Sequence, residues 1–182
     1  MLKIMLIKPK KSLGQNFLHD ENIINKIINA SKISSDDQVL EVGPGTGNLT
    51  KLIISQKPKK IYVIEKDKSL AADLEKQYYN KINIINEDIL KISNEFYSGK
   101  KFLILGNLPY NISTKILSNW CLNNKLNVSK MILMFQKEVA ERILANVNSK
   151  EYSRITILSK WKFDIRKITD VKPNSFFPKP KI

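Results

Sequence analysis

The tetrapeptide Asn107-Leu108-Pro109-Tyr110 carries the residues in this sequence that are best suited to chemistry, and it follows a buried strand expected over residues 101–106. An amine attached to an aromatic base is a poor nucleophile, because its lone pair is delocalised into the ring. The side-chain oxygen of Asn107 and a backbone carbonyl beside Pro109 would favour a pyramidal nitrogen by accepting its hydrogens. Pro109 keeps the segment rigid, and Tyr110 offers a face for a base to stack on. The pattern predicts a site that activates an amine, with a plain Asn-x-Pro turn as the alternative.

Residues 39–50 read as a buried strand, a glycine-rich turn and the start of a helix over 49–54. Glycines at alternate positions, beginning with Gly43 and Gly45, permit positive φ angles and let a ligand lie against bare backbone. We expect Thr46 or Asn48 to cap the helix. The third glycine comes one residue too early for the G-x-G-x-x-G fingerprint of dinucleotide sites, which disfavours a dehydrogenase. The form E-x-G-x-G-x-G instead resembles class I S-adenosylmethionine-dependent methyltransferases. Another nucleotide site and a ligand-free turn remain open.

Two acidic residues end the next two predicted strands. Glu65 is the last residue of the strand over 60–65 and suits a pair of ribose hydroxyls, which need paired acceptors. Asp88 follows the strand over 82–86 and can accept from an adenine amino group, with Ile89 beside the ring. Because ligands bind at the carboxyl ends of strands in open α/β sheets, both acids should face the same crevice as the glycine turn. Solvated strand ends are the alternative for each.

The elements that must position these residues alternate between strand and helix. We expect further strands over 131–135 and 165–171, and helices over 21–30, 68–79, 113–122, 137–145 and 152–161. Asp20 and Asp67 are the expected caps of the helices that follow them. This alternation predicts an α/β fold with a mostly parallel, doubly wound sheet in one domain over residues 1–182.

Composition limits the partners. The 182 residues hold 31 Lys and Arg against 17 Asp and Glu, a net charge of +14 with a pI near 9.7, which favours a nucleic-acid partner. An AT-rich genome would also produce many lysines. Because Cys121 is the single cysteine and His19 the single histidine, we expect no disulfide and no metal site. We also expect no membrane segment, a cytoplasmic location and a monomer.

Several motifs in order along the chain resemble the KsgA/RsmA family of ribosomal RNA adenine dimethyltransferases. They are Lys11 to Leu18, Glu41 to Gly47, Asn107 to Thr114, Phe135 to Ala140, Asn148 to Arg154 and the tail Pro173 to Lys181. The resemblance implies a Rossmann-like fold that transfers methyl groups from S-adenosylmethionine, leaving S-adenosylhomocysteine. The substrate would be two adjacent adenosines in the 3′-terminal hairpin of small-subunit ribosomal RNA, with an immature small subunit as partner.

The resemblance also implies residue roles. Asn16 and Leu18 would close over the cofactor, Gly43 and Gly45 would lie in its site, and Glu65, Asp88 and Asn107 would contact it. The catalytic residues would be Asn107, Leu108, Pro109, Tyr110 and Phe176, with Phe176 sandwiching the target base opposite Tyr110 and Phe177 as an open alternative. Apart from the resemblance, the charge of Lys8, Lys10, Lys11, Lys179 and Lys181 predicts phosphate contacts, with solvated side chains as the alternative.

One departure and two alternatives accompany the resemblance. Family members continue past this tail into a small helical domain that helps grip RNA, so we expect that domain to be missing here. Large-subunit adenine methylases that confer macrolide resistance share the glycine turn and an Asn-x-Pro-aromatic motif. A non-catalytic nucleic-acid-binding relative is the second alternative, and measured methyl transfer would exclude it.

Overall fold

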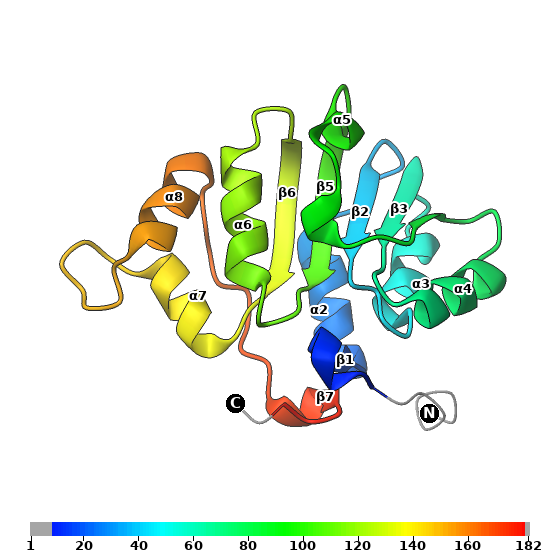
Figure 1. Ribbon diagram of the computed structural model, residues 1–182, viewed down its shortest axis with the longest axis horizontal. Helices are drawn as coiled ribbons and strands as arrows, with labels where there is room; N and C mark the ends of the chain where they lie inside the picture. The colour runs from blue at the N-terminus through cyan, green and yellow to red at the C-terminus, as the bar shows by residue number, and fades with distance from the viewer. Residues whose placement is uncertain (1–8, 181–182) are drawn as a thin grey trace.

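The computed structural model of the chain describes residues 9–180, and its centre is a five-stranded sheet of order β4-β3-β2-β5-β6 (Figure 1). All four strand pairings in this sheet are parallel, as expected. The chain order reverses between β2 and β5, which is where such sheets open a crevice for ligands. The strands are β2 (Gln38–Val42), β3 (Lys60–Ile64), β4 (Asn83–Ile85), β5 (Lys101–Asn107) and β6 (Asn127–Met134).

Helices cover both faces of the sheet, so the doubly wound arrangement is confirmed (Figure 1). The helices are α2 (Glu21–Ser31), α3 (Asn48–Ser55), α4 (Lys68–Gln77), α5 (Asn94–Tyr97), α6 (Ser113–Leu122), α7 (Lys137–Leu144) and α8 (Arg154–Lys162), with 3-10 turns at η1 (Lys11–Leu13), η2 (Ile89–Lys91) and η3 (Pro173–Ser175). Among residues 9–180, no helix is long and apolar enough to cross a membrane.

The strands alternate their side chains between two hydrophobic clusters. In β2, Val39 packs with α2, α3 and α4 on one face, whereas Leu40 and Val42 pack with α5 and α6 on the other. A smaller cluster joins α6 to α7 and α8 at one edge, and Cys121 is buried there. Because both faces are covered, the carboxyl ends of the strands are the part of the sheet that remains open to a ligand.

Two short strands join segments far apart in the sequence. Strand β1 (Phe17–Leu18) pairs antiparallel with β7 (Phe176–Phe177), so that Leu18 faces Phe176 (Figure 1). Beside this pair, the His19 amide donates to the Ser175 carbonyl at 3.0 Å, and the Ser175 hydroxyl donates to Asp20 at 2.8 Å. We call this β1–β7 pair with its flanking bonds the terminal strap.

Some of the predicted helix caps and strands are present in the structure, and others are not. Asp20 and Asp67 cap α2 and α4 as predicted. Thr46 and Asn48 do not cap α3, because Gly47 in a left-handed conformation takes the cap position without a side-chain bond. Residues 165–171 form no strand, although Ile165 and Val171 pack inward. The burial of these side chains does not by itself supply a neighbouring strand with which to pair. We expected the basic segment from Lys8 to Lys11 to be extended, but Lys11 is the first residue of η1. The expected phosphate contacts of Lys8 and Lys181 lie outside the described residues.

Candidate active site

A cleft of about 1160 Å³, measured out to its open mouth, lies at the carboxyl ends of β2, β3, β4 and β5. Ten of the eleven predicted site residues line it: Asn16, Leu18, Gly43, Gly45, Glu65, Asp88, Asn107, Leu108, Pro109 and Tyr110. The eleventh, Phe176, does not. The strand ends thus bring the glycine turn, both acids and the Asn107 tetrapeptide to one cleft, as the order of the sheet requires.

The glycine turn forms one wall of the cleft with bare backbone. Gly43 and Gly45 have φ angles of 68° and 57°, a region that side chains rarely adopt. A Cβ atom on Gly45 would lie 2.6 Å from Cδ1 of Phe17, and one on Gly43 would lie 3.3 Å from the Asn107 carbonyl oxygen. Glycine is therefore needed at both positions to let β1 and β5 approach the turn.

Asn107 has a fixed amide orientation. Its Nδ2 atom donates to the Asn16 carbonyl at 2.7 Å, and only the nitrogen can do so because a carbonyl oxygen is purely an acceptor. No group among the described residues donates to the Asn107 Oδ1 atom. The side chain therefore has its acceptor available at the cleft, as the chemistry predicted for this residue requires.

The two backbone carbonyls beside Pro109 have different environments. The carbonyl of Pro109 accepts from the Ile112 amide at 3.1 Å. The carbonyl of Leu108 accepts from no group in residues 9–180, although Leu108 is only 1% exposed and lines the cleft. A buried carbonyl without a donor is unusual and favours a ligand hydrogen there. The sequence did not show which of these two carbonyls would accept a hydrogen of the target amine. Among the described residues, the Leu108 carbonyl is the one without a donor and so is available to do so.

Glu65 is nearly buried at the end of β3. One carboxylate oxygen accepts from the Gly45 amide at 3.3 Å and the other accepts from the Asp67 amide at 2.8 Å. Burial raises the pKa of Glu65, and these two amide bonds oppose that shift. Each carboxylate oxygen keeps a further lone pair, so Glu65 can still accept from two hydroxyl groups.

Asp88 forms an ion pair with a lysine side chain beside the cleft. Its carboxylate accepts from the Leu90 amide and from Lys66 Nζ, both at 2.9 Å. Partial burial alone would raise the pKa of Asp88, but the amide and the ammonium hold it below its usual range. Sequence reasoning did not connect Lys66 with Asp88, because nothing in the spacing places their side chains together.

Glu41 is a buried acid that sequence reasoning named in the glycine motif without a role. It is 1% exposed, and Thr50 of α3 donates to its carboxylate at 2.6 Å. Burial raises the pKa of Glu41 to about 8. The Thr50 bond ties the end of β2 to the helix that follows the glycine turn, so Glu41 braces the turn between them.

Residues 12–18 also line the cleft, with Phe17 against Gly45 of the glycine turn, and were only partly predicted. Asn48 Nδ2 donates to the Leu18 carbonyl at 2.8 Å, instead of capping its own helix. Asp67 accepts from Lys10 Nζ and from Gln15 Nε2, each at 2.9 Å. We expected Asp67 only as a helix cap, and its position two residues after Glu65 was the available signal.

The aromatic candidates for base stacking differ in exposure. Tyr110 lines the cleft, and burial raises its pKa. Phe176 is 6% exposed and packs with Leu18 in the hydrophobic core. Its neighbour Phe177 is 40% exposed. The partner of Tyr110 across a target base therefore remains a prediction, with Phe177 the more accessible of the two rings.

A parallel sheet whose glycine turn, strand-end acids and Asn-Leu-Pro-Tyr segment share one cleft defines a Rossmann-like methyltransferase fold. The chain belongs to the ribosomal RNA adenine dimethylase family, whose model matches residues 7–182. The expected family resemblance is thus confirmed.

Individual relatives agree with this membership. The chain is 52% identical to the ribosomal RNA small subunit methyltransferase A of Pelagibacter ubique, over 98% of this chain and 68% of that protein. It is 45% identical to the same-named protein of Malacoplasma penetrans, over 94% of this chain and 62% of the other. The chain therefore spans about two thirds of the length of these curated relatives.

Solved structures share the fold. A dimethyladenosine transferase from Plasmodium falciparum superposes with a TM-score of 0.81 at 36% identity, over 91% of this chain and 59% of that one. The 23S rRNA methyltransferase ErmE superposes with a TM-score of 0.73 at 26% identity, over 92% of this chain and 66% of that one. The likeness confirms the expected Rossmann-like α/β fold.

Proposed function

We propose that this chain transfers methyl groups from S-adenosylmethionine to the exocyclic amines of two adjacent adenosines in the 3′-terminal hairpin of small-subunit ribosomal RNA. One observation carries the proposal: the Asn107 Oδ1 atom and the Leu108 carbonyl accept from no group within residues 9–180, and they share one cleft with a glycine turn and Glu65. Family membership and the names of the relatives support the same reaction.

The residues of the cleft fit S-adenosylmethionine. Glu65 is a buried carboxylate with lone pairs to spare for ribose hydroxyls, and Asp88 with Ile89 offers an acceptor and an apolar surface for adenine. Bare backbone at Gly43 and Gly45 leaves room for the methionine part. When bound, S-adenosylmethionine supplies a methyl group on a positively charged sulfur, and S-adenosylhomocysteine remains after transfer.

The chemistry of this chain is mainly positioning. Asn107 Oδ1 and the Leu108 carbonyl accept the two hydrogens of the target amine and so direct its lone pair at the methyl carbon. Pro109 keeps these acceptors in place, and Tyr110 stacks on the base, which must leave its own stack in the RNA to enter the cleft. The amine becomes acidic once methylated, so its proton passes to water without a strong base. Correct alignment can supply several powers of ten in rate.

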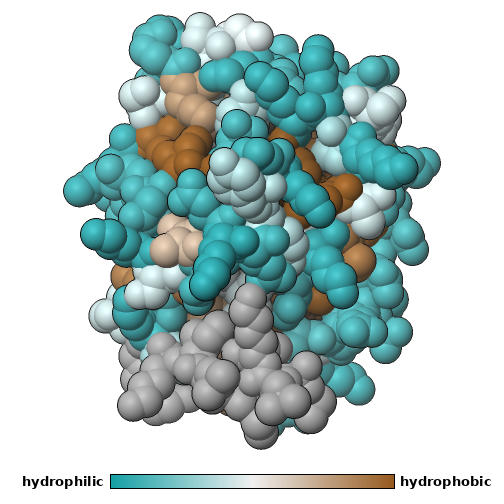
Figure 2. All heavy atoms as spheres, turned by 90° about the vertical axis from the view of Figure 1, so that its right-hand side faces the viewer, coloured by the Kyte–Doolittle hydropathy of each residue, from teal (hydrophilic) through white to brown (hydrophobic). Residues whose placement is uncertain are grey.

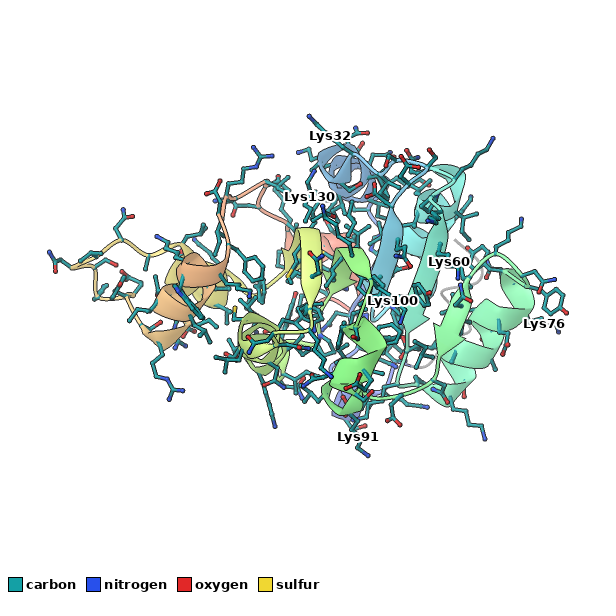
Figure 3. All side chains as sticks on the ribbon, turned by 90° about the horizontal axis from the view of Figure 1, so that it is seen from above. Lys32, Lys60, Lys76, Lys91, Lys100 and Lys130 are labelled. Carbon is teal, nitrogen blue, oxygen red and sulfur yellow. The ribbon has the colours of Figure 1, made fainter. Side chains whose placement is uncertain are left out.

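The basic charge supports an RNA partner without defining one binding face. Six lysines on six elements or their flanking loops are spread around the molecule, at positions 32, 60, 76, 91, 100 and 130 (Figure 3). The side that carries α3 and α4 is largely hydrophilic (Figure 2). Some lysines have internal roles: Lys130 donates to the Ser31 carbonyl at 2.9 Å, and Lys100 lies 4.8 Å from the Phe96 ring centre.

The proposal also covers the extent of the domain, its oligomeric state and its location in the cell. We propose that residues 1–182 form the methyltransferase domain, that the unmatched third of the longer relatives adds grip on RNA, and that the domain is a monomer. We further propose that it modifies immature small subunits in the cytoplasm. Light scattering of the purified chain measures its mass directly, and a dimer would contradict the monomer.

The test uses labelled S-adenosylmethionine with undermethylated small subunits, large-subunit RNA and an unrelated RNA. We expect label on small-subunit adenosines, and we expect Asn107→Ala to lower transfer by at least ~100-fold, as when one oriented polar group is removed from an active site. The control is Asn83→Ala, which removes a similar bond, from Asn83 Nδ2 to the Ile61 carbonyl, away from the cleft.

Each other outcome contradicts a stated part of the proposal. Near-normal transfer by Asn107→Ala, or equal loss in Asn83→Ala, would remove Asn107 from the mechanism. Label on large-subunit RNA would favour the macrolide-resistance type, to which ErmE is similar in fold. No label on any RNA, with cofactor still bound and with a relative's C-terminal third fused to the chain, would favour a non-catalytic binder.

A further inference from the structure

Asp67 lies at a junction that its role as a helix cap does not explain. Its side chain is only 3% exposed, yet it holds an ion pair with Lys10, whose side chain is 51% exposed. The cap itself needs one carboxylate oxygen, which accepts from the Ser69 amide at 3.0 Å. The remaining acceptor sites of Asp67 bind a segment more than fifty residues away in the sequence.

The contacts of Asp67 with that segment form a closed ring. Lys10 Nζ donates to Oδ1 of Asp67 and Gln15 Nε2 donates to Oδ2, both at 2.9 Å. Gln15 Oε1 in turn accepts from the Lys10 backbone amide at 2.7 Å. Both ends of the Gln15 amide are therefore used, and the loop between Lys10 and Gln15 is fixed at each end.

The same residue is bonded to the floor of the cleft. The Asp67 amide donates to Glu65 at 2.8 Å, and Glu65 also accepts from the Gly45 amide. Residues 12–18, which overlap the ring and continue from it, line the same cleft as Glu65. Asp67 thus joins Glu65, the acid proposed to bind the ribose, to residues 12–18, which line the same cleft.

We propose that Asp67 is a positioning residue, which holds residues 10–18 over the cleft through Lys10 and Gln15 and so slows the release of the methyl donor. The inference rests on the proposed function for the identity of that donor. Asp67 is not among the residues that line the cleft, so its loss should affect how long the donor stays bound more than the rate of transfer.

The first measurement needs no ligand. Hydrogen exchange is followed at the backbone amides of Lys10 and Leu13, which bond to Gln15 Oε1 and to the Lys10 carbonyl. Asp67→Asn keeps a good helix cap but loses the ion pair, and Gln15→Leu opens the ring. We expect exchange about five- to tenfold faster in both variants, the ratio for losing one modest bond.

The second measurement is calorimetric and kinetic binding of S-adenosylhomocysteine. We expect Asp67→Asn, Gln15→Leu and Lys10→Met to raise Kd about three- to tenfold through faster dissociation, and we expect Asp67→Asn to raise KM with kcat nearly unchanged. The control is Lys125→Met, which removes an exposed ion pair with Glu95 and the same unit of charge away from the cleft. It should leave exchange, Kd and KM as in the unaltered chain.

Three results would overturn the inference. Unchanged exchange in Asp67→Asn would mean that Asp67 does not hold the segment, whatever Gln15→Leu shows, because Gln15 itself bonds the Lys10 amide. Faster exchange with unchanged Kd would mean that the segment is held but does not retain the donor. An equal rise in Kd for Lys125→Met would assign the effect to net charge. If the unaltered chain bound no S-adenosylhomocysteine, the proposed function would fail too, while exchange would still decide whether Asp67 holds the segment.

Discussion

Individual carboxyl groups around the cleft differ in charge because their surroundings differ. Glu41 is surrounded by core residues, and burial raises its pKa to about 8. Asp67 is also desolvated, which alone would raise its pKa, but Lys10, Gln15 and the Ser69 amide together hold it below its usual range. The domain therefore keeps a neutral acid under the glycine turn and charged acids around it.

Glu41 should make the stability of the domain depend on pH. Its folded pKa of about 8 exceeds the ordinary value of 4.5, so its contribution is complete below pH 4.5 and is lost as pH rises through 8. We expect Glu41→Gln to remove a slope of up to about 1.4 kcal/mol per pH unit over this window, the value for one extra bound proton. Urea unfolding between pH 5 and 9 measures the slope.

The reference for this comparison is Glu95→Gln, which changes an exposed acid paired with Lys125. Its stability curve should run parallel to that of the unaltered chain. Parallel curves for Glu41→Gln as well would show that Glu41 is charged in the folded state.

The sequence predicted which residues lie at the site better than it predicted their hydrogen bonds. The sequence indicated Glu65, Asp88 and Asn107 because each follows a predicted strand. It could not indicate that the Leu108 carbonyl is free while that of Pro109 is bonded, since this depends on how the chain turns into α6. The partners of Asp67 were equally hidden, because Lys10 and Gln15 are more than fifty residues away in sequence.

The glycine turn between β2 and α3 works as a unit with β1. Its shape depends on positive φ angles and on the Phe17 ring lying against Gly45. A substitution at Gly45 therefore meets two separate penalties, one from the backbone and one from the clash.

We expect Gly45→Ala to lower the free energy of unfolding by about 2–4 kcal/mol and to weaken donor binding, since strain and overpacking add. The matched control is Gly99→Ala, because Gly99 has a φ of 68° with no atom within 4 Å of its would-be Cβ. This control should lose only about 1–2 kcal/mol, the backbone part alone. Thermal unfolding and calorimetry provide both values, and equal losses would argue against the Phe17 contact.

Elements were predictable where an apolar pattern coincided with a sheet partner. Strand β2 was predicted from a short run rich in β-branched residues, and α2 from apolar residues at helical spacing, namely Ile23, Ile24, Ile27 and Ile28. Residues 165–171 have a similar pattern but pair with no strand, since only side chains are buried there. Strands β1 and β7 have two residues each, too few for any periodicity.

The whole domain is joined at its two ends by the terminal strap. Phe176 contributes a nearly buried ring to the core beside Leu18, whereas the Phe177 ring is 40% exposed. The strap connects this core to the wall of the cleft, because the Leu18 carbonyl also accepts from Asn48.

Substitutions of the two phenylalanines should separate the effect on stability from the effect on substrate contact. We expect Phe176→Ala to lower the free energy of unfolding by about 3 kcal/mol, as for a buried ring, and Phe177→Ala to change it by less than about 1 kcal/mol. Chemical unfolding tests this, and methyl transfer by Phe177→Ala tests base stacking. Full activity in a stable Phe177→Ala variant would leave Phe176 as the stacking candidate.

The terminal strap also has a consequence for the order of events during synthesis. The cleft wall at Leu18 emerges from the ribosome early, but its partner Phe176 is made more than 150 residues later. At ~5–20 residues per second the two are separated by several seconds or more. A nascent chain therefore has all five strands of the central sheet before β1 can pair with β7, so the terminal strap forms only when almost the whole domain has been translated.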